Sequence, residues 1–104
     1  MAKFTFSRRA EADLLSIADY TVRKWGVAQA GLYFDELETY CQMLADNPDL
    51  GRLCDYIRRG LRRHEHGKHV LFYRHERGGI LVSRILHQRM LPDQNAIDDQ
   101  DDAP

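Results

Sequence analysis

Five histidines stand close together in the second half of this chain, and such a cluster raises the possibility of a metal site. They are His64, His66, His69, His75 and His87. Alternate residues of a β-strand point to the same side, so a strand through His64 and His66 would present both imidazoles together. However, Gly67 interrupts that strand before His69, and no cysteine or carboxylate stands at a recognisable ligand spacing. The pattern therefore favours surface or hydrogen-bonded histidines, and we expect neither a metal nor another cofactor.

Arginine is the second residue type that could carry chemistry. Residues 52–89 contain ten basic side chains and three acidic ones, whereas residues 1–51 contain five basic and eight acidic ones. Guanidinium groups bind phosphate in a bidentate manner, so a sheet edge that carries several arginines could hold a nucleic-acid backbone. The charge pattern predicts a basic working surface, and the alternative is a solvated basic face without a partner.

Arg84 is a special case among the arginines of the predicted strands, which are Arg62, Arg63, Arg74 and Arg84. In a strand, side-chain alternation places Arg84 on the same face as Ile80, Val82 and Leu86, which are all apolar. Arg84 therefore either reaches past the end of the sheet or forms an ion pair with a helix carboxylate such as Asp13 or Asp35.

Other residue types that serve common enzyme classes lack the required context. Gly78-Gly79 lies between two predicted strands and opens no helix, so it is no phosphate-binding loop. Ser83 has no nucleophile-elbow context. Cys41 lies in an apolar helical stripe and is expected to be a buried structural thiol. Two unpaired cysteines, no apolar run of membrane-spanning length and no signal-peptide pattern predict a cytoplasmic protein without a membrane partner.

The elements that must position these residues can be read from hydrophobic spacing. Residues 3–6 predict a short strand, and Ser7 stands where the N-cap of a helix belongs. Apolar residues then recur every three or four positions up to Gly26, which predicts an amphipathic helix with a glycine terminator. A second such helix is predicted from about 27 to 45, ended by Asn47-Pro48. The two helices predict an antiparallel hairpin.

The second half of the chain predicts strands. Residues 61–65, 69–74 and 80–86 are rich in β-branched, aromatic and aliphatic side chains, and residues 49–60 predict a crossing loop. The whole pattern predicts an α+β domain over residues 1–91, with an N-terminal strand and an antiparallel helical hairpin packed on a three- to four-stranded antiparallel sheet. Residues 92–104 contain five aspartates and no basic residue, which predicts an acidic C-terminal tail.

Tyr20 and Trp25 lie late in the first predicted helix and allow two interpretations. Packing in the core is slightly favoured. If both side chains were exposed, they would form an apolar docking patch for a partner helix.

Several segments, taken in order, resemble one known family. They are SRRAEADLLSIADY at residues 7–20, RKWGVAQA at 23–30, Asn47-Pro48 with Gly51-Arg52, Gly60-Leu-Arg-Arg63 with Gly67-Lys-His-Val-Leu-Phe-Tyr-Arg74, and Ile85-Leu-His-Gln-Arg-Met90. Together they cover nearly all of residues 3–91. This sequence resembles the ParE branch of the RelE/ParE toxin superfamily.

The resemblance implies a partner and a target. It implies two antiparallel helices against a twisted antiparallel sheet, and a ParD-like antitoxin whose disordered segment folds on the toxin in a hetero-oligomer. ParE toxins poison DNA gyrase and trap the enzyme on cleaved DNA. The related RelE branch instead cuts mRNA in the ribosomal A site.

The two targets can be distinguished by the side chains that each would require of the toxin. RNA cleavage needs a base, a phosphate clamp and an acid for the leaving oxygen. By the resemblance to RelE, the catalytic set would be Arg62, Arg63, Arg84 and His87. However, no tyrosine follows Tyr73, so the C-terminal tyrosine of many ribonucleases in this group is missing. The basic segment also lacks the lysines expected of a ribosome binder. We therefore favour a binding toxin that poisons DNA gyrase, without enzymatic activity, and keep the ribosome-dependent mRNA endoribonuclease as the alternative.

The expected binding residues follow from this interpretation. The last strand and its exit would face the target through Arg84, His87, Arg89 and Met90. The helical hairpin would bind the antitoxin through Leu14, Tyr20, Trp25 and Tyr33. Direct nucleic-acid binding is possible but not required.

Overall fold

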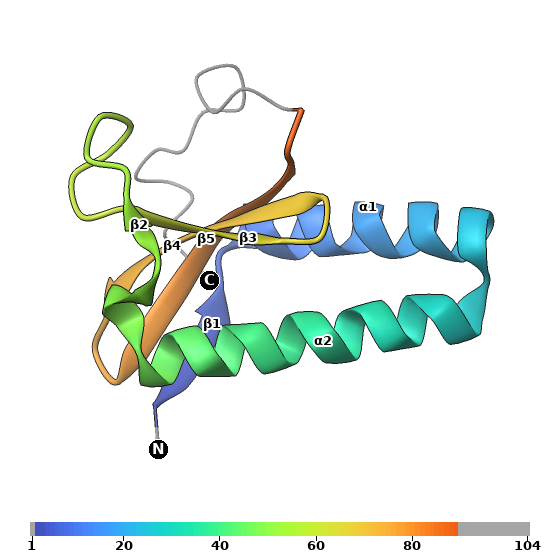
Figure 1. The fold of residues 1–104 in the computed structure, drawn as a ribbon, viewed down its shortest axis with the longest axis horizontal. Helices are drawn as coiled ribbons and strands as arrows, with labels where there is room; N and C mark the ends of the chain where they lie inside the picture. Colours follow the sequence, from blue (N-terminus) through green and yellow to red (C-terminus); the bar gives the residue numbers. More distant parts are fainter. Residues whose placement is uncertain (1, 90–104) are drawn as a thin grey trace.

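Two long helices lie against one face of a five-stranded sheet in the computed structural model, which describes residues 2–89 (Figure 1). The elements follow the chain as β1 (Lys3–Phe6), α1 (Arg8–Trp25), α2 (Val27–Asp46), the 3-10 helix η1 (Pro48–Leu50), β2 (Arg52–Leu53), β3 (Arg62–His66), β4 (His69–Glu76) and β5 (Gly79–His87). The predicted α+β class is confirmed, and the predicted helices and strands lie within about two residues of those observed. The predicted acidic tail lies outside the described residues.

The helical hairpin begins and turns at the residues that the sequence indicated. The Ser7 hydroxyl accepts a hydrogen bond from the Ala10 amide at 3.1 Å and donates one to the Ser83 carbonyl oxygen at 2.7 Å, which ties the helix start to β5. Gly26, with φ of 90°, separates the two helices, and its amide donates to Val22. Most other residues avoid this backbone conformation, so the turn needs a glycine.

The sheet differs from the predicted three- to four-stranded antiparallel one. Its order is β1-β5-β4-β3-β2, and β1 pairs with β5 in parallel, so the sheet is mixed. The pairing of β1 could not be inferred, because side-chain alternation says nothing about which distant strand lies beside it. β2 falls within the predicted loop 49–60, where two residues are too few to produce an alternation pattern.

β1 covers only part of the β5 edge. It pairs with Gly79 to Val82, and the Ser7 amide then donates to the Val82 carbonyl. A β-bulge follows, since Phe72 pairs with Arg84 while Tyr73 pairs with Val82. The bulge changes the direction of the side chains that follow it, and beyond it the edge of β5 meets α1 instead of a strand.

Both faces of the sheet are covered by apolar side chains. The larger cluster lies between the helices and the sheet and includes Leu37, Cys41, Leu71 and Tyr73, each almost fully buried. A smaller cluster contains Cys54, Leu61, Val70, Phe72 and Leu86, with Ile57 packed against it. The predicted burial of Cys41 is confirmed, and this burial raises the pKa of its thiol to about 12.

Candidate partner-binding surfaces

The arginines of β3 are engaged within the protein. Arg62 donates to the carbonyl oxygens of Gly51 at 2.6 Å and Asp49 at 3.1 Å, and its guanidinium lies 3.4 Å from the Asp49 carboxylate. Arg63 lies 3.2 Å from the carboxylate of Glu65, which also pairs with Arg52. These contacts hold the crossing segment and β2 against β3. The two arginines predicted to clamp phosphate therefore have structural partners.

Arg84 also has a structural partner, which is the Asp13 carboxylate of α1. Its Nε and Nη2 atoms donate to the two Asp13 oxygens at 2.9 and 3.0 Å, and the amide of Ile85 donates to the same carboxylate at 2.9 Å. Only 8% of Arg84 is exposed. Of the two sequence interpretations, the ion pair with a helix carboxylate is the one observed. The prediction that Arg84 contacts a target is not supported, because the side chain is buried at the junction of α1 and β5.

The exit of β5 offers the other predicted target-binding residues. His87 is half-buried and its ring lies 5.7 Å from that of His69, while Arg89 is exposed. The Arg89 amide donates to the His87 imidazole at 3.2 Å, which fixes the direction of the ring. Met90 lies outside the described residues. This corner therefore retains His87 and Arg89 as surface candidates.

The helical hairpin carries exposed apolar side chains that the core does not use. Leu15, Val22 and Trp25 are exposed, and together with the half-buried Ala18 they follow the spacing that places residues on one flank of a helix. We call these four residues the α1 stripe. Leu15 is 73% exposed and Trp25 is 61% exposed, which is unusual for large apolar residues grouped on a single flank. The end of the hairpin projects beyond the sheet, so no strand covers it (Figure 1).

The four residues predicted to bind an antitoxin are divided between surface and core. Tyr20 and Trp25 are both exposed, so the interpretation that they pack in the core is wrong. They do not form the single docking patch that was considered for the two side chains together. Tyr20 lies on a different flank of α1 from Trp25, and its hydroxyl is 3.1 Å from the Lys24 ammonium. Leu14 and Tyr33 are partly buried against the main core. Leu15 and Val22 were missed, although their spacing from Trp25 is visible in the sequence.

A second group of exposed apolar side chains lies on the segment between α2 and β3. It comprises Leu50, Leu53 and Tyr56, of which Tyr56 is 77% exposed. The sequence did not indicate this group, because an irregular segment has no periodicity that would separate exposed from buried positions.

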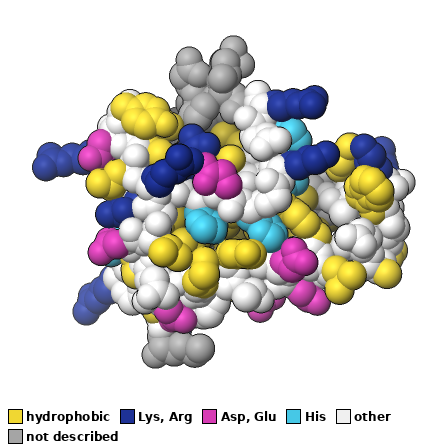
Figure 2. Space-filling model, in the orientation of Figure 1, with side chains coloured by type: hydrophobic (Ala, Val, Ile, Leu, Met, Phe, Trp, Pro, Cys, Tyr) yellow, Lys and Arg dark blue, Asp and Glu magenta, His cyan; other side chains and the backbone are white. Residues whose placement is uncertain are grey.

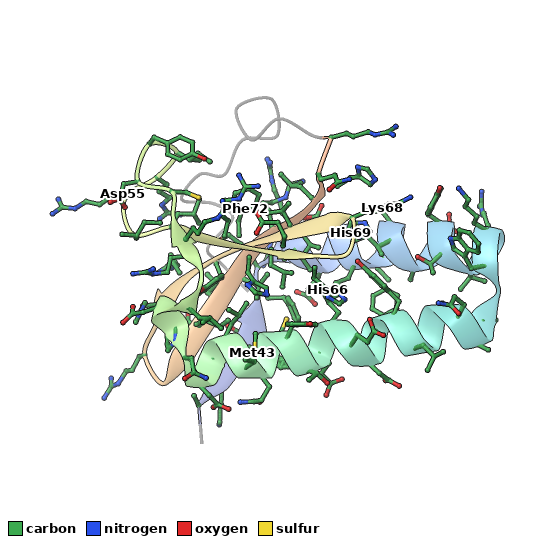
Figure 3. All side chains as sticks on the ribbon, in the orientation of Figure 1. Met43, Asp55, His66, Lys68, His69 and Phe72 are labelled. Atoms are coloured by element: carbon green, nitrogen blue, oxygen red, sulfur yellow. The ribbon has the colours of Figure 1, made fainter. Side chains whose placement is uncertain are left out.

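Ring contacts connect four of the five histidines, His64, His66, His69 and His87, with each other or with tyrosines of α2. Figure 3 shows His66 and His69 where α2 meets the turn between β3 and β4. The Tyr33 hydroxyl lies 2.5 Å from Nδ1 of His69, and the His66 ring lies between Tyr33 and Tyr40 at centroid distances of 5.1 and 4.6 Å. Figure 2 shows histidine side chains at the surface of this face among hydrophobic ones. Among the described residues, no three histidine, cysteine or acidic side chains are arranged to hold a metal. The cluster depends on two tyrosines that the histidine spacing did not reveal.

No helix within residues 2–89 has the length and apolar content needed to cross a membrane. The charged positions on both long helices account for this.

Comparison with known proteins gives one consistent relationship. The sequence profile of the family described as ParE toxin of type II toxin-antitoxin system, parDE, matches residues 4–92. Toxin ParE1 of Mycobacterium tuberculosis is 45% identical over 95 residues, which span 90% of this chain and 97% of the relative. Toxin ParE1 of Caulobacter vibrioides is 42% identical over 92 residues, which span 86% of this chain and 93% of the relative.

The fold has a solved counterpart. A chain from the chromosomal ParDE TA system of P. aeruginosa superposes with a TM-score of 0.68 and 24% sequence identity, and the match covers 84% of this chain and 96% of that chain. At this identity the likeness concerns the fold alone. The profile match over most of the chain and the two close relatives establish that this chain belongs to the ParE toxin family of type II toxin–antitoxin systems.

Proposed function

We propose that this chain poisons DNA gyrase and is neutralised by a ParD-like antitoxin that docks on the α1 stripe. The observation that carries the proposal is the family match over residues 4–92. In this proposal the protein is a binding toxin, and its own side chains perform no covalent chemistry.

The α1 stripe suits an amphipathic helix of a partner. Leu15, Val22 and Trp25 project from one flank over nearly three turns, which suits a docking helix whose apolar anchors are three or four residues apart. Trp25 lies under the Lys24 ammonium at 5.5 Å, so the end of the stripe combines an aromatic face with a positive charge. A partner helix with apolar anchors and a nearby carboxylate complements this arrangement.

Substitution of the stripe tests this docking surface. Val22→Glu and Leu15→Glu place a charge where the partner helix packs, and both side chains are exposed, so we expect the fold to remain intact. Loss of a central apolar anchor costs about 2–4 kcal/mol of binding free energy, which lowers antitoxin affinity roughly 30-fold or more. Tyr56→Glu, at an exposed aromatic outside the hairpin, is the matched control and should keep wild-type affinity. Equal affinities for all three variants in calorimetry would place the antitoxin elsewhere.

The target-facing surface is assigned to the exit of β5. His87 and Arg89 remain accessible there, whereas Arg84 is occupied by Asp13. Arg89→Glu should reduce toxicity without lowering stability, because the side chain is exposed. An equivalent reversal at Arg23, an exposed residue of α1 paired with Asp19, serves as the control.

The ribonuclease alternative has weaker support from the geometry. Its proposed clamp consists of Arg62, Arg63 and Arg84, and each of these side chains binds a carboxylate or carbonyl group of the protein. Release of all three would dismantle the contacts of β2, β3 and α1. His87 alone does not supply a phosphate clamp.

The function is tested first in cells. We expect expression of the chain alone to arrest division with signs of DNA damage, and co-expression of the cognate antitoxin to restore growth. Growth arrest with intact DNA and cleaved mRNA would instead support the ribonuclease. Harmless accumulation of folded protein would remove the toxic function from this chain.

A further inference from the structure

In the histidine and tyrosine cluster at one end of the sheet, His66 and His69 have no part in the proposed docking surfaces. We propose that His66 and His69 form a proton-sensitive latch, which holds the β3–β4 turn against α2 at neutral pH and releases it in mild acid. The proposal goes beyond the toxin function and does not depend on which target the toxin binds.

The latch is built from contacts between distant segments. Figure 3 shows His66 and His69 near the turn of the β3–β4 hairpin, on the side of α2. Tyr33 of α2 contacts both: its hydroxyl lies 2.5 Å from Nδ1 of His69 and 3.4 Å from the backbone oxygen of His66. Tyr40, two turns further along α2, also lies against the His66 ring, with a centroid distance of 4.6 Å. The latch therefore joins α2 to both residues that flank the turn.

His66 is poorly placed to carry a charge. It is 7% exposed, and its Nε2 atom is buried with no hydrogen-bond partner among the described residues. Burial lowers the pKa of the imidazole, and the neighbouring His64 adds to this effect. The Glu36 carboxylate, 3.8 Å from Nε2, acts in the opposite direction but is itself largely exposed. Burial outweighs this carboxylate, so the neutral imidazole is favoured.

The protonated form of His69 is also unfavourable, because of its burial and its histidine neighbours. Burial lowers its pKa, and His87 and His66 lower it further because a second positive charge nearby is unfavourable. The Lys68 side chain in the turn is exposed, and the Lys68 backbone oxygen accepts a hydrogen bond from Gln88. Tyr33 does not compensate as an anion, because burial raises the pKa of its hydroxyl to about 12. Within residues 2–89, Glu36 is the carboxylate that these contacts place against the cluster.

The direction of the pH effect follows from these shifts. An unfolded histidine takes up its proton near pH 6.5, whereas both latch histidines take theirs up at lower pH in the folded state. The stability that the two neutral histidines contribute is therefore fully present above about pH 6.5 and is lost as the pH falls below this value. Each histidine lowers the folding constant by at most about tenfold per pH unit in that range.

Titration of the imidazole protons by NMR between pH 8 and 5 measures the latch directly. We expect His66 and His69 to titrate below the pH of about 6.5 at which an unfolded histidine takes up its proton. His75 is exposed, lies 3.0 Å from Asp49 and, among the described residues, makes no contact with the two latch histidines. We also expect amide exchange, corrected for its intrinsic pH dependence, to accelerate in acid for residues 64–71 more than for residues 80–85. Titration of both latch histidines near pH 6.5 would overturn the proposal, as would uniform exchange behaviour.

Three variants separate the latch from ordinary acid sensitivity. The double variant His66→Phe/His69→Phe keeps two rings but cannot be protonated, so its urea midpoint should change little between pH 7.5 and 5.5. His75→Phe, the control, should retain the wild-type acid loss. Glu36→Gln removes the carboxylate that favours charged His66, so it should increase the loss of stability in acid. The Glu36 side chain is largely exposed, so we expect this variant to fold. If the double variant fails to fold, a Glu36→Gln protein with an unchanged or smaller acid loss still overturns the latch.

Discussion

Replacement of Asp13 by alanine should be among the most damaging single substitutions outside the apolar core. The Asp13 carboxylate receives three hydrogen bonds, two from Arg84 and one from the Ile85 amide, all between 2.9 and 3.0 Å. Its side chain is 15% exposed and that of Arg84 is 10% exposed, so water replaces these contacts poorly. Removal of one partner of a buried ion pair costs about 3–5 kcal/mol, because the remaining charge stays buried.

Urea denaturation followed by circular dichroism measures this loss. Asp19→Ala is the matched control, because Asp19 pairs with Arg23 at 3.2 Å on the exposed side of the same helix. An exposed pair contributes about 0–1 kcal/mol, so the two aspartates of α1 should differ by about 2 kcal/mol or more. If Asp13→Ala destabilises no more than Asp19→Ala, the structural role given to the Asp13–Arg84 pair is incorrect.

A double variant then asks whether Arg84 also contacts the target. Asp13→Asn/Arg84→Met removes both charges and keeps an amide oxygen that can accept from Ile85. We expect it to recover much of the stability lost in Asp13→Ala, since a buried pair replaced as a unit is often close to neutral. Full toxicity in this variant would confine Arg84 to a structural role. Loss of toxicity in a stable protein would restore it to the target surface.

Two further substitutions test how the sheet is held together. Tyr73→Phe should lower the free energy of unfolding by about 1–3 kcal/mol in urea denaturation. The reason is that the buried Tyr73 hydroxyl accepts a hydrogen bond from the Gly51 amide and donates one to the Pro48 carbonyl oxygen, both at 2.8 Å. An unchanged urea midpoint would show that these two hydrogen bonds do not stabilise the fold. Gly79→Ala should lower the free energy of unfolding by at least about 3 kcal/mol, since the new methyl group would lie 1.7 Å from the Lys3 carbonyl oxygen in β1. In Gly78→Ala the methyl group meets open space, so this variant should lose only about 1 kcal/mol, from its φ of 82°. The reverse order in thermal denaturation would contradict the close approach of β1 to β5.

Features encoded over a few residues could be predicted from the sequence. Ser7 begins α1 and Gly26 ends it, because capping and left-handed turns depend on the residue at one position. The strands of the β3–β4–β5 meander could be located because each has enough residues for a pattern. The ion pair of Arg84 was one of two interpretations, with Asp13 among the example partners, since an arginine within an apolar strand needs either a partner or an exit to solvent.

Features that join distant segments could not be predicted in the same way. The Tyr33–His69 contact links residues 36 positions apart and depends on where α2 crosses the sheet. The exposure of Tyr20 and Trp25 depends on how far the hairpin projects beyond the sheet. Arg62 was expected to be available for phosphate because its partner, Asp49, becomes a neighbour only when the crossing segment folds back. Glu65 is two residues from Arg63 in the same strand, and this local pair was missed.

A cleavage assay with purified gyrase, supercoiled plasmid and the antitoxin-free protein tests the proposed gyrase target most directly. We expect linear DNA to accumulate only when gyrase and this protein are both present, and added antitoxin to abolish the effect. The Val22→Glu variant should still produce linear DNA but resist the antitoxin. Unaffected gyrase, with a protein shown to be folded and free of antitoxin, would contradict the gyrase target.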